Sequence, residues 1–338
     1  MGKDGPLVPT LGFGLMGLSV SYGQAPPDEE RLAVLDRAWE LGETFWDSAA
    51  AYGDSEVLIG KWFALHPERR QDIFLATKFG LGWAVEDGKF KASFDSSPEN
   101  CRESCERSLR ALGVDCIDLL YVHRFDSVTP VEKTMEAFVQ LKKEGKIKYI
   151  GLSECSSDTL RRAHAVHPIT AAQIEFSPWS LDIENESGTH LRDTCRELGV
   201  AIVAYSPLGR GFLTGRYKSW DDFEEKDNRR MLPRFSPENF SKNLDLLKIF
   251  ENLAAEKGCS PAQILLAWGM FQGPDFFPIP GTKSVKYLEE NLGSFNVRIT
   301  SEDDAHIRAK IMATGGAAGN RIYGSVKESS AFADTPPL

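Results

Sequence analysis

The sequence predicts a single-domain α/β protein, a (β/α)8 TIM barrel with long loops at the carboxyl ends of its strands. Two observations lead to this prediction. Eight short strand-like runs alternate with helical patterns along the 338 residues, and no shift in composition marks a domain boundary. The chain is also 42% hydrophobic, which is enough apolar material for one large core.

The first half of the chain is expected to supply four strand–helix units. A short strand-like run at 10–15 precedes a helix at 29–41, in which Leu32, Leu35 and Ala38 recur on one face. Ser97 and Pro98 are suited to the N-cap and the first position of a helix. The other expected strands are 43–47, 73–78 and 117–122, and the other helices are 54–65, 98–112 and 131–144.

The second half continues the same alternation. A capping box, Ser260-Pro261-Ala262-Gln263, begins one of its helices, because the side chains of its first and last residues can each satisfy a free backbone N–H group. The expected strands are 147–152, 170–175, 200–205 and 276–279. The expected helices are 157–166, 186–198, 261–271, 284–292 and 301–312.

Two long connections and a tail complete the predicted organisation. Residues 80–96 and 209–238 each follow a strand, so both are expected to lie as loops over the mouth of the barrel. The barrel is assigned to residues 1–312. Residues 313–338 are rich in Gly, Ser and Pro, and they are expected to form a partly ordered C-terminal tail.

Charge and composition exclude several classes of protein. The net charge of −10 provides no basic surface for nucleic acid. No run of 18 apolar residues predicts a membrane span, and the N-terminus lacks the apolar segment of a signal peptide. The six cysteines form no C-x-x-C pair, so they are expected to remain thiols in the cytoplasm. No H-E-x-x-H motif is present, and no metal site is predicted.

The run from Gly12 to Gly17 matches the pattern G-x-G-x-x-G, which occurs in dinucleotide-binding Rossmann folds. That motif must open a helix whose N-terminus receives the pyrophosphate. Here a loop with Pro26 and Pro27 follows instead, and the next strand ends in Asp47, 30 residues after Gly17 rather than about 20. We therefore expect these glycines to let the backbone approach a ligand at the end of the first strand.

Four residues able to move protons lie at or near the ends of successive expected strands. Asp47, Lys78 and His123 each end a strand, and Tyr52 follows Asp47 by five residues. Because the carboxyl ends of barrel strands share one mouth, all four side chains are expected to meet there. Taken singly, each residue is more often a surface or packing residue, and their joint placement is what favours a site.

The chemistry expected of this set is proton transfer to a carbonyl oxygen. A free phenol has a pKa of about 10, and a neighbouring ammonium stabilises the phenolate. Tyr52 is therefore the candidate acid, with Lys78 as the ammonium and Asp47 holding Lys78 in place. His123 would orient the substrate oxygen. An alternative is an aldolase-type barrel in which Lys78 forms a Schiff base.

At this point the sequence resembles the aldo-keto reductases, and it looks closest to the branch with pyridoxal-reductase-like enzymes and relatives of potassium-channel β subunits. The matching stretches are Trp46–Gly53 (WDSAAAYG), Ala76–Gly80 (ATKFG), Leu120–Arg124 (LYVHR), Gly151–Ser153 (GLS), Gln173–Ser177 (QIEFS), Ala204–Gly211 (AYSPLGRG) and Pro280–Lys283 (PGTK). They are spread over nearly the whole chain. The resemblance implies an NADPH-dependent oxidoreductase that reduces a small aldehyde or ketone to an alcohol.

The resemblance also implies roles for individual residues. Asp47, Tyr52, Lys78 and His123 match the family's catalytic tetrad. The implied cofactor-binding residues are Met16, Asp47, Ser153, Gln173, Tyr205, Ser206, Leu208, Gly209, Gly211, Lys283, Ser284, Glu290 and Asn291. Among these, Tyr205 matches the aromatic that stacks on the nicotinamide, and Lys283 with Ser284 matches the 2′-phosphate site. An independent argument points to the same place. Barrels often bind phosphate in the loops after the seventh and eighth strands, and Lys283 and Lys286 lie there.

The resemblance leaves open both the activity and the assembly state. An NADPH-binding regulatory or redox-sensing subunit with little turnover is the alternative function, since such proteins keep the tetrad. A homo-oligomer is compatible with the sequence. Many relatives have Asn where this chain has Glu154, which puts one nicotinamide contact in question because a carboxylate cannot donate as an amide does. Side chains at the mouth that suggest an apolar substrate are Met16, Tyr22, Trp46, Trp83, Phe125 and Trp179.

Overall fold

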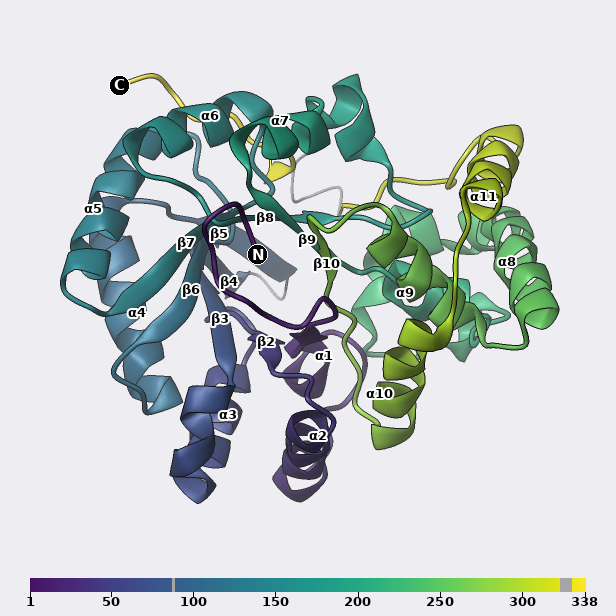
Figure 1. The fold of residues 1–338 in the computed structure, drawn as a ribbon, viewed down its shortest axis with the longest axis horizontal. Coiled ribbons are helices and arrows are strands. Elements are labelled where there is room, and N and C mark those ends of the chain that lie inside the picture. Colours follow the sequence, from purple (N-terminus) through teal and green to yellow (C-terminus); the bar gives the residue numbers. More distant parts are fainter. Residues whose placement is uncertain (87–88, 323–329) are drawn as a thin grey trace.

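The computed structural model describes residues 1–86, 89–322 and 330–338 and confirms the (β/α)8 fold (Figure 1). Eight parallel strands follow one another in the order β1-β2-β3-β6-β7-β8-β9-β10. Their bounds are β1 Phe13–Gly14, β2 Phe45–Asp47, β3 Phe74–Phe79, β6 Ile117–Val122, β7 Ile147–Ser153, β8 Ala171–Glu175, β9 Ala201–Tyr205 and β10 Phe276–Pro278.

The first strand is shorter than predicted and closes the barrel. The amides of Gly12 and Gly14 donate to the carbonyl oxygens of Pro278 and Pro280, at 2.9 and 3.0 Å. A Cβ atom on Gly12 would lie 2.4 Å from the ring of Phe45, and one on Gly14 would lie 2.7 Å from the backbone oxygen of Ile279. The glycines are therefore required mainly by the close approach of strands, and the expectation that they serve a ligand is wrong for Gly12.

The inside of the barrel is filled by side chains. Its apolar cluster consists of Phe45, Ala76, Leu119, Tyr121, Ala171, Ala201, Val203, Phe277 and Ile279. The N-terminal segment covers the amino end of the barrel, where Met1 and Val8 pack against this cluster. The amide of Lys3 donates to the carbonyl of Gly199 at 2.7 Å. With this end closed, the carboxyl ends of the strands are left to form the site.

Helices surround the strands and bury a second, larger apolar cluster between the two layers. Their bounds are α1 Met16–Ser19, α2 Asp28–Glu40, α3 Ser55–Leu65, α4 Pro98–Leu112, α5 Val131–Lys143, α6 Ser157–Val166, α7 Leu191–Leu198, α8 Pro237–Lys257, α9 Pro261–Phe271, α10 Val285–Leu292 and α11 Ser301–Ala313. The predicted capping box is present: Ser260 Oγ accepts from the Gln263 amide, and Gln263 Oε1 accepts from the Ser260 amide.

The connection predicted as a loop at 80–96 forms an antiparallel hairpin, so that prediction is wrong. Its strands are β4 (Leu81–Glu86) and β5 (Lys89–Phe94), and residues 87–88 lie outside the described chain. The connection at 209–238 is confirmed as a non-repetitive segment. It contains the short 3-10 turns η4 Gly209–Thr214, η5 Trp220–Asp222, η6 Asn228–Met231 and η7 Pro233–Phe235.

Two helical predictions need correction. The sequence pattern predicts no element at 239–260, where the structure has most of the 21-residue helix α8. Ser236 caps this helix and Pro237 is its first residue. The helix expected at 186–198 begins only at Leu191, because Thr189 and His190 have left-handed φ values of 54° and 53° that interrupt the helical path.

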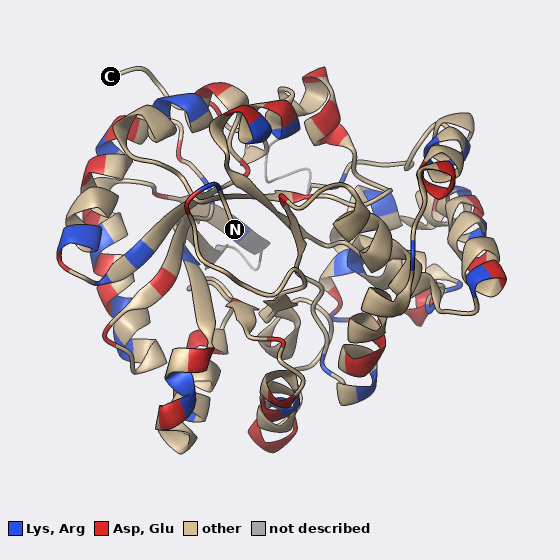
Figure 2. Cartoon of the chain, in the orientation of Figure 1, with Lys and Arg blue, Asp and Glu red and all other residues tan. Residues whose placement is uncertain are grey.

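Charged side chains lie mainly on the outer helices, where acidic and basic residues are interspersed (Figure 2). In the part of the chain that the structure describes, no helix is long and apolar enough to cross a membrane. The tail returns to the barrel, where Ala333 forms an isolated parallel bridge with Cys155 just after β7. The predicted tail includes residues 323–329, which lie outside the described chain.

Candidate active site

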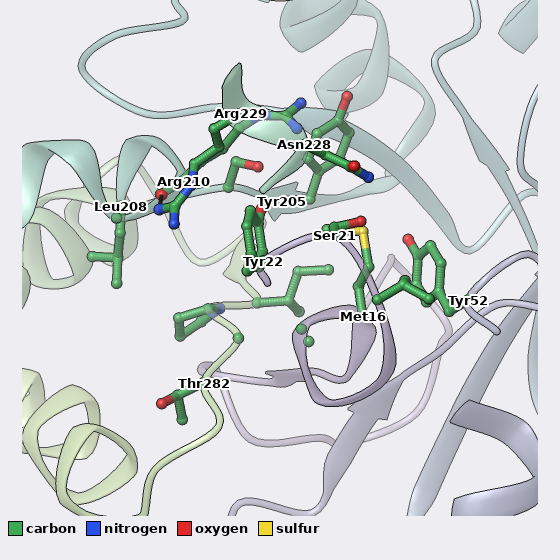
Figure 3. A pocket seen from close by; sticks show the side chains of 18 of the residues that line it. Met16, Ser21, Tyr22, Tyr52, Tyr205, Leu208, Arg210, Asn228, Arg229 and Thr282 are labelled. Atoms are coloured by element: carbon green, nitrogen blue, oxygen red, sulfur yellow. Dashed lines mark hydrogen bonds between the residues drawn. The ribbon is translucent and has the colours of Figure 1, made fainter. Parts of the chain in front are cut away.

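A cavity of about 1180 Å³ extends across the carboxyl ends of the strands. Figure 3 shows Met16 and Tyr52 on one side of this pocket and Leu208 and Thr282 on the other. Most of the predicted site residues line it: Met16, Asp47, Tyr52, His123, Ser153, Gln173, Tyr205, Ser206, Leu208, Gly211, Lys283, Ser284, Glu290 and Asn291. Lys78 and Gly209 do not line the cavity but lie behind its wall.

Lys78 connects the carboxylate and the phenol that the sequence singled out. It is the second-to-last residue of β3, and its side chain is fully buried. Its Nζ donates to Asp47 Oδ1 at 2.5 Å, to the carbonyl of Ser48 at 2.7 Å and to Tyr52 Oη at 3.4 Å. The three donors of the ammonium are thus used within the protein.

The position of Lys78 is fixed by the parallel pairing of β2 with β3 and by the buried polar groups around it. Burial alone would lower the pKa of Lys78, but the Asp47 carboxylate and the Tyr52 oxygen outweigh burial and raise it. The lysine therefore stays charged at neutral pH. Asp47 is held in turn by Gln173, whose Nε2 donates to Oδ2 at 2.7 Å.

His123 follows β6 and faces Tyr52 edge-on, with 5.5 Å between the ring centroids. Burial, followed by the charges of Arg124 and Lys78, holds the pKa of His123 well below its usual range, so the imidazole is neutral. Arg124 lies beside it and also lines the cavity. One of its nitrogens donates to the His123 carbonyl at 2.7 Å and to Ser153 Oγ at 3.3 Å.

The middle of the cavity is lined by the segment that follows β9. Ser206, Gly209, Arg210 and Gly211 all have positive φ values, between 53° and 83°. These left-handed residues turn the backbone sharply along the cavity wall, where clustered amides are typical of anion sites. Gly209 itself packs against Trp179, since a Cβ there would lie 2.6 Å from the indole, so its role is in the turn and not in lining the cavity.

The far end of the cavity is lined by Lys283, Ser284, Glu290 and Asn291, which lie after β10 and on α10. Lys283 Nζ donates to the carbonyl oxygens of Tyr22 and Gln24, at 2.5 and 3.2 Å. Burial lowers the pKa of Lys283. Lys286, which lies on the next turn and was also considered from the sequence, does not line the cavity.

Several lining residues were not predicted from the sequence, notably Arg216, Asn228, Arg229 and Arg321. Arg216 lies at the far end, where its guanidinium is 5.5 Å from the ring of Tyr287. The amide of Asn228 donates to the carbonyl of Ser21 at 3.0 Å, so the 209–238 segment reaches the loop after α1. The charged run at 226–230 in a long loop was the available signal for part of this set.

The aromatic residues expected at the mouth divide into two groups. Met16, Tyr22 and Trp83 line the cavity. Trp46, Phe125 and Trp179 are at most 5% exposed and belong to the core, so their expected place at the mouth is wrong. Strand parity explains Trp46, which points outward from β2 toward the helices while its neighbours Phe45 and Asp47 point inward.

The cavity has the features that a reduced nicotinamide dinucleotide requires. It joins the buried tetrad to a lysine- and arginine-bearing end by a tightly turned backbone segment, and its volume accommodates a large ligand. Tyr205 presents its ring midway along the wall (Figure 3). Among the described residues, no group of three His, Cys, Asp or Glu side chains is placed to hold a metal ion.

Comparison with known proteins gives consistent matches over nearly the whole chain. A profile of the aldo/keto reductase family matches residues 10–312. The aldo-keto reductase str7 of Strobilurus tenacellus is 53% identical over 89% of this chain and 88% of its own length. The aldo-keto reductase yakc [NADP(+)] of Schizosaccharomyces pombe is 48% identical over 98% and 96%, respectively.

Solved structures show the same architecture. The glycerol dehydrogenase of Gluconobacter oxydans superposes with a TM-score of 0.81 at 26% identity, over 95% of this chain and 97% of the other. A thermostable aldo-keto reductase in complex with the inhibitor epalrestat gives a TM-score of 0.71 at 27% identity, over 91% and 97%. Both likenesses extend over the full barrel.

Proposed function

Because this chain belongs to the aldo/keto reductase family and is an NADP-dependent oxidoreductase, we propose that it reduces an aldehyde or ketone to an alcohol with Tyr52 as the general acid. The observation that carries the proposal is the buried chain of contacts from Asp47 through Lys78 to Tyr52. That chain ends in a phenol that lines the cavity beside a neutral histidine. Such a set can deliver a proton to a carbonyl oxygen.

The protein's share of the reaction is to position groups and to transfer one proton. NADPH, when bound, supplies the hydride that forms the new C–H bond at the carbonyl carbon. Tyr52 gives its proton to the carbonyl oxygen, and the ammonium of Lys78 stabilises the phenolate that is left. His123, kept neutral by its surroundings, hydrogen-bonds the same oxygen and orients it. A proton from solvent then restores the phenol.

The remaining roles follow the course of the cavity. Gln173 uses its amide nitrogen on Asp47, which leaves its oxygen to accept from the carboxamide of the nicotinamide. Ser153 lies beside it, and the ring of Tyr205 forms the adjacent wall. The backbone from Ser206 to Gly211 would receive the pyrophosphate. Lys283, Ser284 and Arg216 would together bind the 2′-phosphate.

The Schiff-base alternative does not fit the surroundings of Lys78. A lysine that attacks a carbonyl must be accessible and must become neutral. Lys78 is fully buried, does not line the cavity, and donates to Asp47, Ser48 and Tyr52. Its raised pKa favours the charged form, which is not nucleophilic.

Replacement of Tyr52 by Phe tests the proposal. Tyr52→Phe should bind NADPH like the wild type, as measured by quenching of protein fluorescence, but its turnover of aldehydes should fall by about 10²- to 10⁴-fold. Tyr149→Phe, which alters a phenol at the opposite end of the barrel beside Phe74, is the matched control and should keep full turnover.

Two results would contradict the assignment. Wild-type turnover by Tyr52→Phe would show that another group donates the proton. Tight NADPH binding by the wild type with no consumption across a broad panel of aldehydes and ketones would favour the regulatory or redox-sensing alternative instead.

The proposal extends to the setting of the enzyme. We expect a small carbonyl compound as the substrate, a cytosolic location, and assembly as a homo-oligomer as one possibility for its solution state. All six cysteines are free thiols, in keeping with a reducing compartment. Size-exclusion chromatography with light scattering would measure the assembly state directly.

A further inference from the structure

Glu154 is a buried carboxylate behind the cavity wall, in the position where the family resemblance leads one to expect an amide. It follows β7, has a left-handed φ of 53° and is 1% exposed. Arg321 of the tail grips it with two hydrogen bonds, at 3.0 Å to Oε1 and 2.8 Å to Oε2. Such bidentate pairs fix the orientation of both partners.

The ion pair with Arg321 keeps the carboxyl group of Glu154 ionised. Burial would raise the pKa of Glu154, but the charge and hydrogen bonds of Arg321, with help from Arg124 and Tyr205, lower it to about 2. The carboxylate is therefore ionised at neutral pH and acts only as an acceptor. Besides Arg321, Oε1 accepts a hydrogen bond from the neighbouring phenol.

That phenol is Tyr205, at the end of β9. Its Oη donates to Glu154 Oε1 at 2.7 Å, and one nitrogen of Arg321 lies 3.3 Å from the same Oη. The ring of Tyr205 is thus fixed at its hydroxyl by the residue that follows β7 and by one from the tail. Figure 3 shows this ring lining the pocket.

The tail that carries Arg321 is tied to the barrel at several points. The side-chain amide of Asn243 donates to the carbonyl of Ala318, three residues before Arg321, at 3.0 Å. The amide of Ala333 donates to the carbonyl of Glu154 at 2.8 Å. Arg162 on α6 holds the carbonyl oxygens of Thr335 and Pro336. The position of Arg321 at the cavity is therefore fixed by hydrogen bonds between the tail and the barrel.

We propose that Arg321 is a positioning residue for hydride transfer: through Glu154 it holds the ring of Tyr205, and that ring sets the plane of the nicotinamide. This inference rests on the proposed function. Without Arg321, the buried carboxylate loses its counter-charge and turns toward water or another cation, and the phenol loses its fixed acceptor. A small tilt of the ring then displaces the reacting carbon from the carbonyl.

A double-mutant cycle between Tyr205→Phe and Arg321→Met tests the coupling. The rate of hydride transfer is measured in a single turnover at saturating NADPH, and NADPH affinity is measured separately by fluorescence quenching. Each single variant should slow hydride transfer by about 10- to 100-fold and weaken NADPH. The double variant should be slower than the slower single by no more than about twofold, since both changes break the same contact.

Additive effects in the cycle would overturn the proposal, as would an Arg321→Met variant with normal hydride transfer and normal NADPH affinity. Arg162→Met is the matched control, because Arg162 holds the same tail and grips Glu132 bidentately but lies outside the cavity. It should lower the unfolding temperature without changing the rate of hydride transfer. Slowing in Arg162→Met equal to that in Arg321→Met would also overturn the proposal.

Arg321→Met leaves a buried charge and can fail to fold, so a charge-neutral variant is needed. Glu154→Gln with Arg321→Met removes both charges together, a change that is often tolerated in protein interiors. If this double variant folds and transfers hydride at the wild-type rate, the proposal is wrong. If the wild type itself consumes no NADPH with any carbonyl compound, it is the proposed function that fails, whereas additivity in an active enzyme refutes only the role of Arg321.

Discussion

At the end of the cavity that we assign to the reaction, Asp47, Lys78 and His123 stand on or directly after β-strands. At the end that we assign to the nucleotide, Lys283 and Arg216 stand on loops. The three side chains are at most 6% exposed, and Lys78 is bonded to Asp47 and to the carbonyl of Ser48. Lys283 instead bonds two backbone oxygens of the loop after α1, on a different part of the chain.

The difference indicates how each end achieves its precision. Strand pairing fixes the reacting groups before any ligand arrives, as catalysis by positioned charge requires. The nucleotide end is assembled from segments that meet only over the cavity, for example where Asn228 donates to Ser21. We therefore expect substitutions at the reaction end to abolish turnover and those at the nucleotide end to change affinity.

Lys78→Met should have the largest effect, because it removes the ammonium that stabilises the phenolate and leaves Asp47 buried without its counter-charge. Turnover should fall by about 10²- to 10³-fold. Breaking a buried ion pair costs about 3–5 kcal/mol of the free energy of unfolding, so the variant should also melt earlier. Steady-state kinetics and thermal unfolding measure the two losses separately.

A paired variant separates the two causes. Asp47→Asn combined with Lys78→Met removes both charges, and it should recover much of the lost unfolding temperature but none of the turnover. Recovery of turnover together with stability would mean that the ion pair is only structural, and the contrast between the two ends of the cavity would then disappear.

Lys283→Ala should act on affinity and on the choice of cofactor. Loss of charge-assisted hydrogen bonds worth about 1.5–3 kcal/mol would lower the affinity for NADPH roughly 10- to 100-fold. The affinity for NADH, which lacks the 2′-phosphate, should fall much less. That smaller loss would come only from the hydrogen bonds that Lys283 makes to the loop at Tyr22 and Gln24. Titration of each nucleotide by fluorescence quenching gives both affinities.

Lys286→Ala is the matched control for Lys283, since Lys286 lies three residues further on, in the first turn of α10, but does not line the cavity. It should leave both affinities near the wild-type values. Equal weakening of NADPH and NADH by Lys283→Ala would argue against a phosphate contact and would assign the lysine to holding the loop alone.

The sequence predicted that Asp47, Lys78 and His123 lie close together, because all three stand at strand ends, which converge in a barrel. Asp47, Lys78 and His123 could be found from periodicity and from the convergence of strand ends in a barrel. The family resemblance added Ser153, Gln173 and Tyr205, all of which line the cavity. The eight-strand order follows from the same alternation of strands and helices.

What the sequence did not predict depends on contacts between distant segments. Arg321 and Glu154 are 167 residues apart in the sequence, and no local sequence pattern predicts that they form a pair. Helix α8 follows a run of short turns, so its Ser236-Pro237 start was not separated from the loop before it. The hairpin β4–β5 gains its pairing from an antiparallel ladder that barrel alternation does not suggest.

A further expected effect, on stability alone, concerns Glu43, which precedes β2 and so lies at the opposite end of this strand from Asp47. Both carboxyls are at most 2% exposed. Asp47 is bonded by Lys78 and Gln173, whereas neither oxygen of Glu43 has a hydrogen-bond partner in the described chain. Burial therefore raises the pKa of Glu43 well above its ordinary value, and the folded protein holds this carboxyl protonated.

The sign of the pH dependence follows. Above the ordinary Glu pKa of about 4.3, the unfolded chain ionises while the folded chain keeps its proton, so stability falls by up to about 1.4 kcal/mol per pH unit until the folded pKa is reached. Glu43→Gln removes this penalty, so its gain in unfolding temperature over the wild type should grow from pH 5 to pH 8. Glu30→Gln removes a charge from the exposed face of α2 and controls for net charge. A gain that is constant with pH would mean that Glu43 is ionised in the folded protein and has a partner there. A gain shared by Glu30→Gln would mean that it comes from the change in net charge.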